Sequence, residues 1–268
     1  MASLKNTTVA GTDSAQLPVG TTAQRPGSPV TGDLRFNTDF DTVEYYNGTK
    51  WLYVPNYAET GLVQYNDAAE PASYSGSGTT WGGIEGGNLT LVNGVGFSTD
   101  GSGSLDFDGT NDYASNTTIN TSNTLSFNCW YKADATGGNL VSQGGNSGWR
   151  VRILSSQTNF FDRGTTNYIE ARYAPVTGVW INLCVVGDSS GLKAYRNGVL
   201  IAQNSTAFGG GNTDNFYIGV TDLNGDTGGF SGTEWYNGKI GLIQLYNRAL
   251  GNKEVWQNFQ AFRNRYGV

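Results

Sequence analysis

Short alternating segments separated by glycine- and asparagine-rich turns restrict the fold of this chain more than any other feature. The segment "LKAYRNGVLIA" is the clearest example, because Asn197-Gly198 between two alternating runs is the residue pair that a type I′ hairpin turn requires. Similar turn clusters recur along the chain, and their spacing is typical of an antiparallel sandwich. The strands predicted between them cover residues 125–132, 140–142, 149–154, 168–173, 179–186, 192–196, 199–202, 215–220 and 238–246.

Composition excludes several classes of function. The formal net charge is −6 and the isoelectric point is about 4.6, so the chain repels phosphate and no nucleic-acid partner is expected. The sequence contains no histidine, which removes serine–histidine and cysteine–histidine nucleophile pairs and histidine-ligated zinc sites. No apolar run has the length of a signal peptide core or of a membrane span, so we expect neither a signal peptide nor a membrane partner.

One short helix is predicted at the C-terminal end. Val255, Phe259 and Phe262 recur at helical spacing in "GNKEVWQNFQAFRNRYGV", and Asn252 is in position to cap the first turn. The two cysteines, Cys129 and Cys184, each lie in an apolar strand pattern, which is typical of buried free thiols. A disulfide is the alternative, and it requires the two strands to be neighbours at a suitable distance.

The chain divides into an N-terminal arm at residues 1–16, a small β-meander at 17–55 and a large domain at 61–268. Residues 17–32 contain three of the six prolines, which predicts a linker rather than a strand. The next stretch, "DLRFNTDFDTVEYYNGTKWLYV", predicts three strands in a unit that is too small to bury a core alone. We therefore predict that this unit serves attachment or oligomerisation, and the alternative is that it folds back onto the large domain. The aromatic side chains predicted to make the contact are Phe36, Tyr45, Tyr46, Trp51 and Tyr53.

Two parts of the sequence resemble known families. The stretch "LPVGTTAQRPGSPVTGDLRFNTDFDTVEYYNGTKW" resembles a module of tailed-phage fibre and virion proteins. The large domain resembles the laminin G-like, concanavalin A-like jelly-roll family, through "GSLDFDGTNDY", "LKAYRNGVLIA" and the closing "GKIGLIQLYNRALGNKEVWQNF". The fold class implied is all-β, an antiparallel jelly-roll sandwich with a small N-terminal β-meander and a short C-terminal helix.

The stretch "GSLDFDGTNDYAS" brings together Asp106, Asp108 and Asp112. Leu105 and Phe107 alternate with the first two carboxylates, so the pattern predicts a strand with one buried face that runs into a turn. The first interpretation is therefore structural, and no cofactor is required.

Calcium binding and catalysis are the alternatives for these three aspartates. Carboxylates and turn carbonyls are suitable calcium ligands, and members of the resembled family bind calcium through turn oxygens. The spacing does not match an EF-hand loop, because Thr117 stands where a bidentate Glu is needed. The sequence also lacks the "E-x-D-x-E" strand that jelly-roll glycosidases use, so we expect no enzyme activity.

Aromatic residues in or beside glycine-rich turns are the candidates for carbohydrate binding. Sugars stack their C–H faces on such rings, while neighbouring polar groups bind the hydroxyls. Trp130 and Trp180 lie within predicted strands and are assigned to the core. The predicted glycan-binding residues are Trp149, Tyr173, Trp235 and Tyr236.

These observations combine into one hypothesis about function. We expect a non-enzymatic structural protein on the surface of a tailed-phage virion, made in the host cytoplasm, as a capsid decoration, head fibre or short fibre. Its expected partners are other virion proteins, a host surface glycan and further copies of itself, for which we expect a trimer. The alternatives are a virion-associated glycan hydrolase and an architectural cement protein without a ligand.

Overall fold

The computed structural model describes residues 16–38, 42–54, 57–144, 148–153, 158–162, 169–221 and 235–268. The chain divides into two compact units, Met1–Asn56 and Tyr57–Val268. Of the predicted arm at residues 1–16 only residue 16 is described, and residues 222–234 lie outside the described residues. In the described part, no helix has the length and apolar character needed to cross a membrane.

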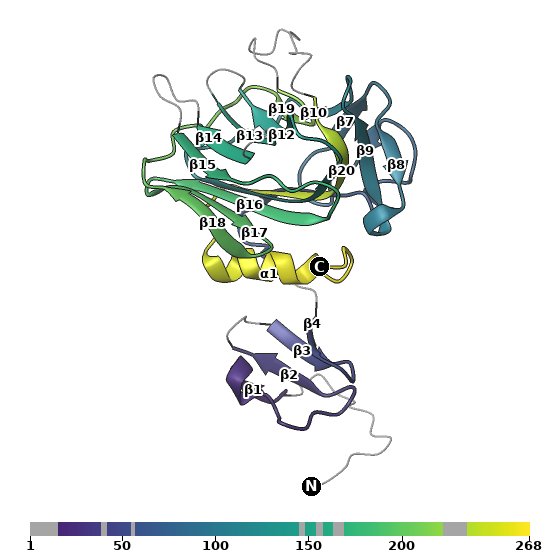
Figure 1. The fold of residues 1–268 in the computed structure, drawn as a ribbon, viewed down its shortest axis with the longest axis vertical. Coiled ribbons are helices and arrows are strands. Elements are labelled where there is room, and N and C mark those ends of the chain that lie inside the picture. Colours follow the sequence, from purple (N-terminus) through teal and green to yellow (C-terminus); the bar gives the residue numbers. More distant parts are fainter. Residues whose placement is uncertain are drawn as a thin grey trace. The chain divides into compact units, whose positions relative to one another are not determined.

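The larger unit is a sandwich of two antiparallel sheets (Figure 1). In the first sheet the strand order is β18-β17-β16-β11-β20-β9-β8, and β5 also pairs with β20. Its strands are β5 (Leu62–Asp67), β8 (Gly96–Ser98), β9 (Ser104–Asp108), β11 (Leu125–Ala133), β16 (Ile181–Asp188), β17 (Gly191–Arg196), β18 (Val199–Asn204) and β20 (Asn237–Tyr246).

In the second sheet the strand order is β15-β14-β13-β12-β19-β10-β7-β6. The predicted all-β jelly-roll fold is confirmed, because strands distant in the sequence pair within both sheets. The strands of the second sheet are β6 (Thr80–Trp81), β7 (Leu89–Val92), β10 (Tyr113–Asn116), β12 (Gly138–Gln143), β13 (Trp149–Ile153), β14 (Thr158–Asp162), β15 (Ile169–Tyr173) and β19 (Phe216–Ile218).

The main core lies between the two sheets. Phe127 of the first sheet contacts Trp149 and Phe216 of the second sheet, with ring centroids 5.9 and 6.5 Å away. All three side chains are buried, because alternate residues of each strand point inward. Burial of this apolar surface is the main force that holds the sheets together.

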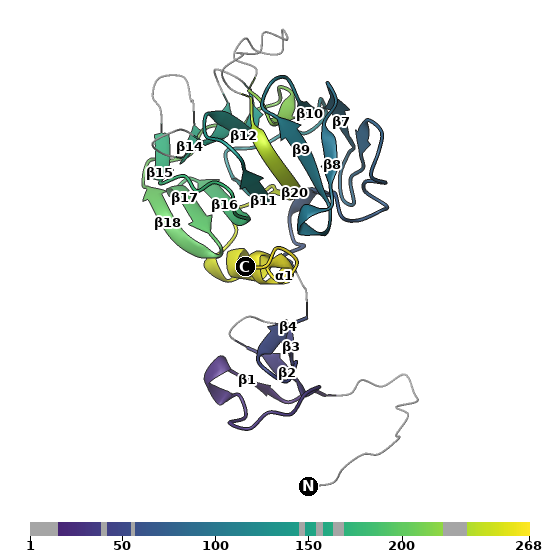
Figure 2. The same cartoon turned by 45° about the vertical axis from the view of Figure 1, so that its right-hand side comes forward.

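The C-terminal helix α1 (Asn252–Phe262) covers the outer face of the first sheet, as both views show (Figures 1 and 2). Trp130 on β11 stacks on Phe259 of the helix at 5.8 Å and on Tyr266 beyond it at 4.3 Å. The helix is confirmed, but the predicted cap is wrong: Gly251 is the N-cap residue, and Asn252 accepts a hydrogen bond from the Tyr195 hydroxyl at 2.8 Å.

The structure has both the predicted hairpin turn and the predicted free cysteines. Asn197 and Gly198 have φ angles of 51° and 77°, as a type I′ turn requires. Cys129 and Cys184 are buried free thiols on neighbouring strands, but one packs in the core between the sheets and the other in the cluster under α1. The two side chains therefore point to opposite faces of the sheet, and the disulfide alternative is wrong.

The N-terminal unit is a sheet of β1 (Val19–Gly20), β2 (Leu34–Asn37), β3 (Thr42–Tyr46) and β4 (Trp51–Tyr53). The predicted meander of three strands is present, but the assignment of residues 17–32 to a linker is wrong at Val19–Gly20. These two residues pair in parallel with Phe36 and Asn37. Their place at the edge of the sheet explains why the surrounding prolines are tolerated.

The N-terminal sheet buries its polar side chains. Glu44 is fully buried and accepts hydrogen bonds from Arg25 at 2.6 and 3.2 Å and from Asn37 at 3.0 Å. Arg35, which is 4% exposed, lies 3.3 Å from the same carboxylate. The buried centre of this unit is therefore an ion network rather than a hydrophobic core.

The opposite face of the same sheet is apolar and partly exposed. Phe36 pairs with Val43, and Leu34 pairs with Tyr45, so these four side chains lie on one face. Leu34 is 49% exposed, and the other three are half-buried. We call these four residues the apolar face of the N-terminal unit.

The five aromatic residues predicted for attachment do not share this face. Phe36 and Tyr45 belong to it, whereas Tyr46 and Trp51 pair on the side that carries Glu44, with ring centroids 5.6 Å apart. The side chain of Tyr53 lies outside the described part. Successive residues of a strand alternate between its faces, so these aromatic side chains are divided between the two sides of the sheet. Their role in attachment stays a prediction.

Candidate functional site

Two of the four predicted glycan-binding residues belong to the core. Trp149 is 1% exposed, and its indole nitrogen donates a hydrogen bond to the Thr121 hydroxyl at 3.1 Å. Tyr236 is also 1% exposed, packs edge-on against Phe107 at 6.0 Å and donates its hydroxyl proton to the carbonyl of Lys239 at 3.2 Å. Burial raises the pKa of Tyr236 well above its ordinary value. Neither ring is available to a sugar, so both predictions are wrong.

Trp235 lies at a half-buried position beside two tyrosines. Its ring centroid is 6.2 Å from that of Tyr113, which in turn is 6.0 Å from the ring of Tyr217. We call these three residues the aromatic patch. The side chain of Tyr173, the fourth predicted residue, lies outside the described part.

The aromatic patch occupies the outer face of the second sheet. Ala114 on β10 and Phe216 on β19 point into the core, so the adjacent Tyr113 and Tyr217 point away from it. Sequence reasoning missed both tyrosines because they lie within strands, where an aromatic residue is usually assigned to the core. The alternation of these tyrosines with the neighbours that are buried was the pattern that could have indicated their outward orientation.

Hydroxyl groups lie in register with the patch across four neighbouring strands. Thr90, Ser115, Tyr217 and Ser142 pair in that order from β7 through β10 and β19 to β12. Thr90 is exposed, Ser115 is half-buried and Ser142 is 1% exposed, so the row runs from solvent into a covered part of the face. The Asn215 amide donates to the Tyr217 hydroxyl at 3.1 Å and positions it.

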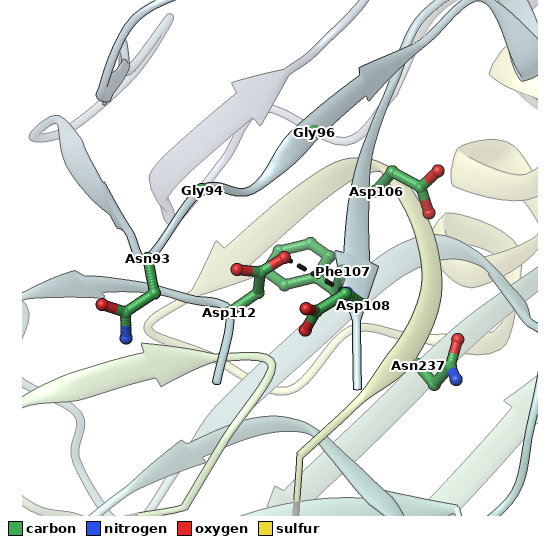
Figure 3. Close-up of a pocket in the computed structure, with 8 residues that line it drawn as sticks. All are labelled: Asn93, Gly94, Gly96, Asp106, Phe107, Asp108, Asp112 and Asn237. Carbon is green, nitrogen blue, oxygen red and sulfur yellow. Dashed lines mark hydrogen bonds between the residues drawn. The ribbon is translucent and has the colours of Figure 1, made fainter. Parts of the chain in front are cut away.

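A separate pocket of about 300 Å³ contains the three aspartates (Figure 3). Asp106 and Asp108 point outward from β9, whereas Phe107 between them is fully buried. Asp106 pairs with Lys239 at 3.4 Å, directly across the strand pair. The predicted strand with one buried face is present as expected. The residues that line the pocket are Asn93, Gly94, Gly96, Asp106, Phe107, Asp108, Asp112 and Asn237.

Asp108 and Asp112 build the turn between β9 and β10. Oδ1 of Asp108 accepts hydrogen bonds from the backbone N–H groups of Thr110 at 2.7 Å and Asn111 at 3.4 Å. Oδ2 of Asp112 accepts from the backbone N–H of Asp108 at 3.2 Å. These contacts are those of a turn closed by aspartate side chains.

Asp112 differs from the other two aspartates in its burial. It is 3% exposed, and its Oδ1 atom has no hydrogen-bond partner among the residues that the structure describes. Burial and the nearby carboxylates of Asp108 and Asp106 raise the pKa of Asp112, although the hydrogen bond from Asp108 opposes that shift. The pocket therefore holds a carboxyl group with one unused acceptor.

The described residues contain no group of three or more histidine, cysteine, aspartate or glutamate side chains arranged to hold a metal ion. Asp106, Asp108 and Asp112 line one pocket, but each is engaged by a different partner. Calcium binding by these residues stays a prediction.

Comparison with solved structures identifies similar folds at low sequence identity. The binding domain of Paraclostridial Mosquitocidal Protein 1 matches with a TM-score of 0.61 and 15% identity, over 76% of this chain and 53% of that one. A structure of botulinum neurotoxin type C, whose cell entry is described as dependent on two ganglioside molecules, gives 0.59 and 13%, over 76% and 51%. The present chain thus spans about half the length of these two structures.

A third similar structure is a domain of nearly the same extent. It is domain 4 of an extracellular arabinanase from Geobacillus stearothermophilus, in complex with arabinotriose. The TM-score is 0.55 and the identity 15%, over 74% of this chain and 97% of that domain. At such identities the likeness shows the fold alone.

Comparison of the sequence itself gives a family. No curated protein matches the chain. Residues 107–256 match the model of the concanavalin A-like lectin/glucanases superfamily, in its laminin G form. Since this match covers more than half of the 268 residues and the two packed sheets agree with it, the chain belongs to the concanavalin A-like lectin/glucanases superfamily.

Proposed function

We propose that the sandwich unit binds a glycan through the aromatic patch and that the protein is not an enzyme. The observation that carries this proposal is the cluster of Tyr113, Tyr217 and Trp235 on the outer face of a lectin-like sandwich. A sugar ring stacks on the half-buried rings of Tyr113 and Trp235, and its hydroxyls bond to Thr90 and Ser115.

Binding to immobilised polysaccharides tests this proposal. The probes are a panel of bacterial surface polysaccharides together with arabinotriose, because a similar domain carries that sugar. Removal of a stacking ring in Trp235→Ala or Tyr113→Ala is expected to weaken binding about fivefold to tenfold. Phe97→Ala is the matched control, because Phe97 is 41% exposed on β8, outside the patch. Equal binding by all four proteins contradicts the proposal.

A measurement of polysaccharide turnover distinguishes the proposed glycan-binding protein from the alternative, a glycan hydrolase. Glu44 forms an ion pair with Arg25 in the N-terminal unit, and Glu254 forms one with Arg248, so neither is free to act as a catalytic acid. The aspartates of the pocket are an acidic cluster beside a cavity and are the candidates for such a role. Release of reducing sugar by the intact protein, abolished by Asp108→Asn, is the result that contradicts the non-enzymatic assignment.

We infer a second role for the N-terminal unit: attachment within a tailed-phage virion, with the sandwich displayed at its surface. The sequence of this unit resembles virion modules, and its sheet leaves the apolar face of Leu34, Phe36, Val43 and Tyr45 partly exposed. Apolar surface of this kind favours association. The partners proposed are further copies of this chain, in a closed trimer, and other virion proteins.

Light scattering on the full chain tests the self-association. A charge placed on the apolar face by Leu34→Asp is expected to convert the oligomer to a monomer, because an unpaired charge is costly in an apolar interface. Lys50→Glu, a charge change on the exposed turn between β3 and β4, is the control and keeps the oligomer. A wild-type monomer at high concentration contradicts the trimer.

Incorporation into particles separates the decoration role from the remaining alternative. A cement protein without a ligand joins particles but binds no polysaccharide of the panel. A displayed lectin does both, and its Leu34→Asp variant still binds glycan while failing to join particles.

A further inference from the structure

The acidic pocket is a different surface from the aromatic patch. Asp112 and Tyr113 are neighbours in the sequence, but successive residues of an extended chain point to opposite sides. Asp112 is accordingly buried beside Phe107, while Tyr113 lies on the outer face of the second sheet. The function proposed above uses the patch and leaves the pocket without a role.

The pocket has more negative charge than the structure compensates. Lys239 lies 3.4 Å from Asp106 and also 3.4 Å from Asp134, which is outside the pocket, so its charge is shared. Asp108 and Asp112 have no ion-pair partner among the described residues. Both accept hydrogen bonds only from backbone N–H groups in that part of the chain, which leaves their negative charge to attract a cation.

Asp112 supplies an independent indication that a ligand belongs there. Its carboxylate lies between Asn93 and Asp108 in Figure 3, and a dashed line marks the bond that occupies Oδ2. Oδ1 is buried and no described residue donates to it, and a buried carboxylate oxygen without a donor is unfavourable. A ligand that donates a hydrogen bond to Oδ1 removes this cost.

The dimensions and the other lining groups favour a polar organic cation over a metal ion. A volume of about 300 Å³ is at the lower end of the range for small-molecule sites and far exceeds what a single ion fills. Asn93 and Asn237 add amide groups that bind hydroxyls. Amide and carboxylate groups together suit a sugar ring that carries an amine.

We propose that this pocket is a second binding site, for the protonated amine of an amino sugar. The ammonium group donates to Oδ1 of Asp112 and to the Asp108 carboxylate, while the ring hydroxyls bond to Asn93 and Asn237. Charge-assisted hydrogen bonds of this kind are stronger than neutral ones, so the pocket discriminates against N-acetylated and acidic sugars.

The pH dependence of binding follows from the same groups. Because burial raises the pKa of the Asp112 carboxyl, this group gains a proton and stops attracting the amine as the pH falls. At high pH the sugar amine loses its proton. Binding is therefore bell-shaped in pH, whereas a neutral sugar lacks the alkaline limb.

Calorimetric titration of the full chain with glucosamine, N-acetylglucosamine and glucose tests the proposal. Glucosamine is expected to bind at least about tenfold more tightly than the other two sugars. Asp112→Asn and Asp108→Asn each remove most of that preference. Asp112→Asn keeps an acceptor for the Asp108 N–H and removes an unfavourable buried charge, so the variant folds.

Two controls separate this proposal from its alternatives. Asp134→Asn changes the other partner of Lys239 without touching the pocket and leaves glucosamine binding intact. Trp235→Ala also leaves it intact, so failure of the patch and failure of the pocket are distinguishable. Equal affinity for the three sugars overturns the proposal, as does binding of calcium or of a lysine-containing peptide in place of glucosamine.

Discussion

In the sandwich unit the strands turn apolar side chains inward, whereas the N-terminal unit buries the carboxylate of Glu44 and the guanidinium of Arg35, with the guanidinium of Arg25 half-buried beside them. Phe127, Trp149 and Phe216 meet between the sheets of the first, and Glu44 meets Arg25 and Arg35 inside the second. The two units also differ in how far their outer apolar side chains are covered. The sandwich covers its outer apolar cluster with α1, while the N-terminal unit leaves its apolar face partly exposed.

The difference shows how size determines the means of stabilisation. A unit of about forty residues cannot bury enough apolar surface to be stable by that means alone. Its ion network specifies one arrangement of the strands, and the exposed apolar face remains available for association. The sandwich is large enough to close its own core, so its surface is free to carry binding groups.

The largest expected effect comes from removal of the buried carboxylate. Glu44→Ala removes the carboxylate that neutralises the buried guanidinium of Arg35 and the half-buried guanidinium of Arg25, which costs about 3–5 kcal/mol. That cost approaches the whole stability of a unit this small, so the N-terminal unit is expected to unfold. Amide hydrogen exchange should show lost protection in residues 16–54 and unchanged protection in the sandwich. Loss of protection in both units would show that the two units do not unfold independently.

A cavity in the sandwich core tests the other half of the comparison. Trp149→Ala removes a ring that is 1% exposed and is expected to destabilise the sandwich by about 3–5 kcal/mol. Thermal unfolding measures this loss, and the N-terminal unit should keep its exchange protection. Trp235→Ala, at a half-buried position, is the control and should lower stability far less while weakening glycan binding.

The acidic turn is expected to contribute a smaller amount. Asp108→Asn weakens the hydrogen bonds to the N–H groups of Thr110 and Asn111 and should cost on the order of 1 kcal/mol. Melting curves with added calcium and with chelator belong to the same experiment, because an ion that binds only the native state raises the melting temperature. A rise that disappears in the variant supports the calcium alternative instead.

The smallest expected effect is that of an ion pair near the surface of the sandwich. Arg248 and the Gly251 N–H lower the pKa of Glu254, so the pair stabilises the fold above the ordinary pKa of a glutamate. This contribution is lost as the pH falls through the lowered pKa. Glu254→Gln should therefore cost about 0.5 kcal/mol at neutral pH and nothing in acid. A cost that persists in acid indicates that packing, not charge, is lost.

Alternation and turn chemistry were sufficient to predict much of the architecture. The strand at Leu125–Ala133, the hairpin at Asn197-Gly198 and the helix at Asn252–Phe262 all lie where local patterns indicated. Local patterns act through neighbouring residues, so they are visible without the fold. The N-cap at Gly251 was missed because asparagine is the more usual cap.

The sequence by itself determined the all-β class, the exclusion of histidine chemistry and the division into a small and a large unit. Only the tertiary structure decided which rings reach the surface. Trp149 and Tyr236 lie beside glycine-rich turns, as Trp235 does, and yet both are buried. The reason is that burial depends on what packs across the sandwich, and those partners come from strands distant in the sequence. For the same reason, the apolar face of the N-terminal unit and the unused oxygen of Asp112 appear only once the strands are placed together.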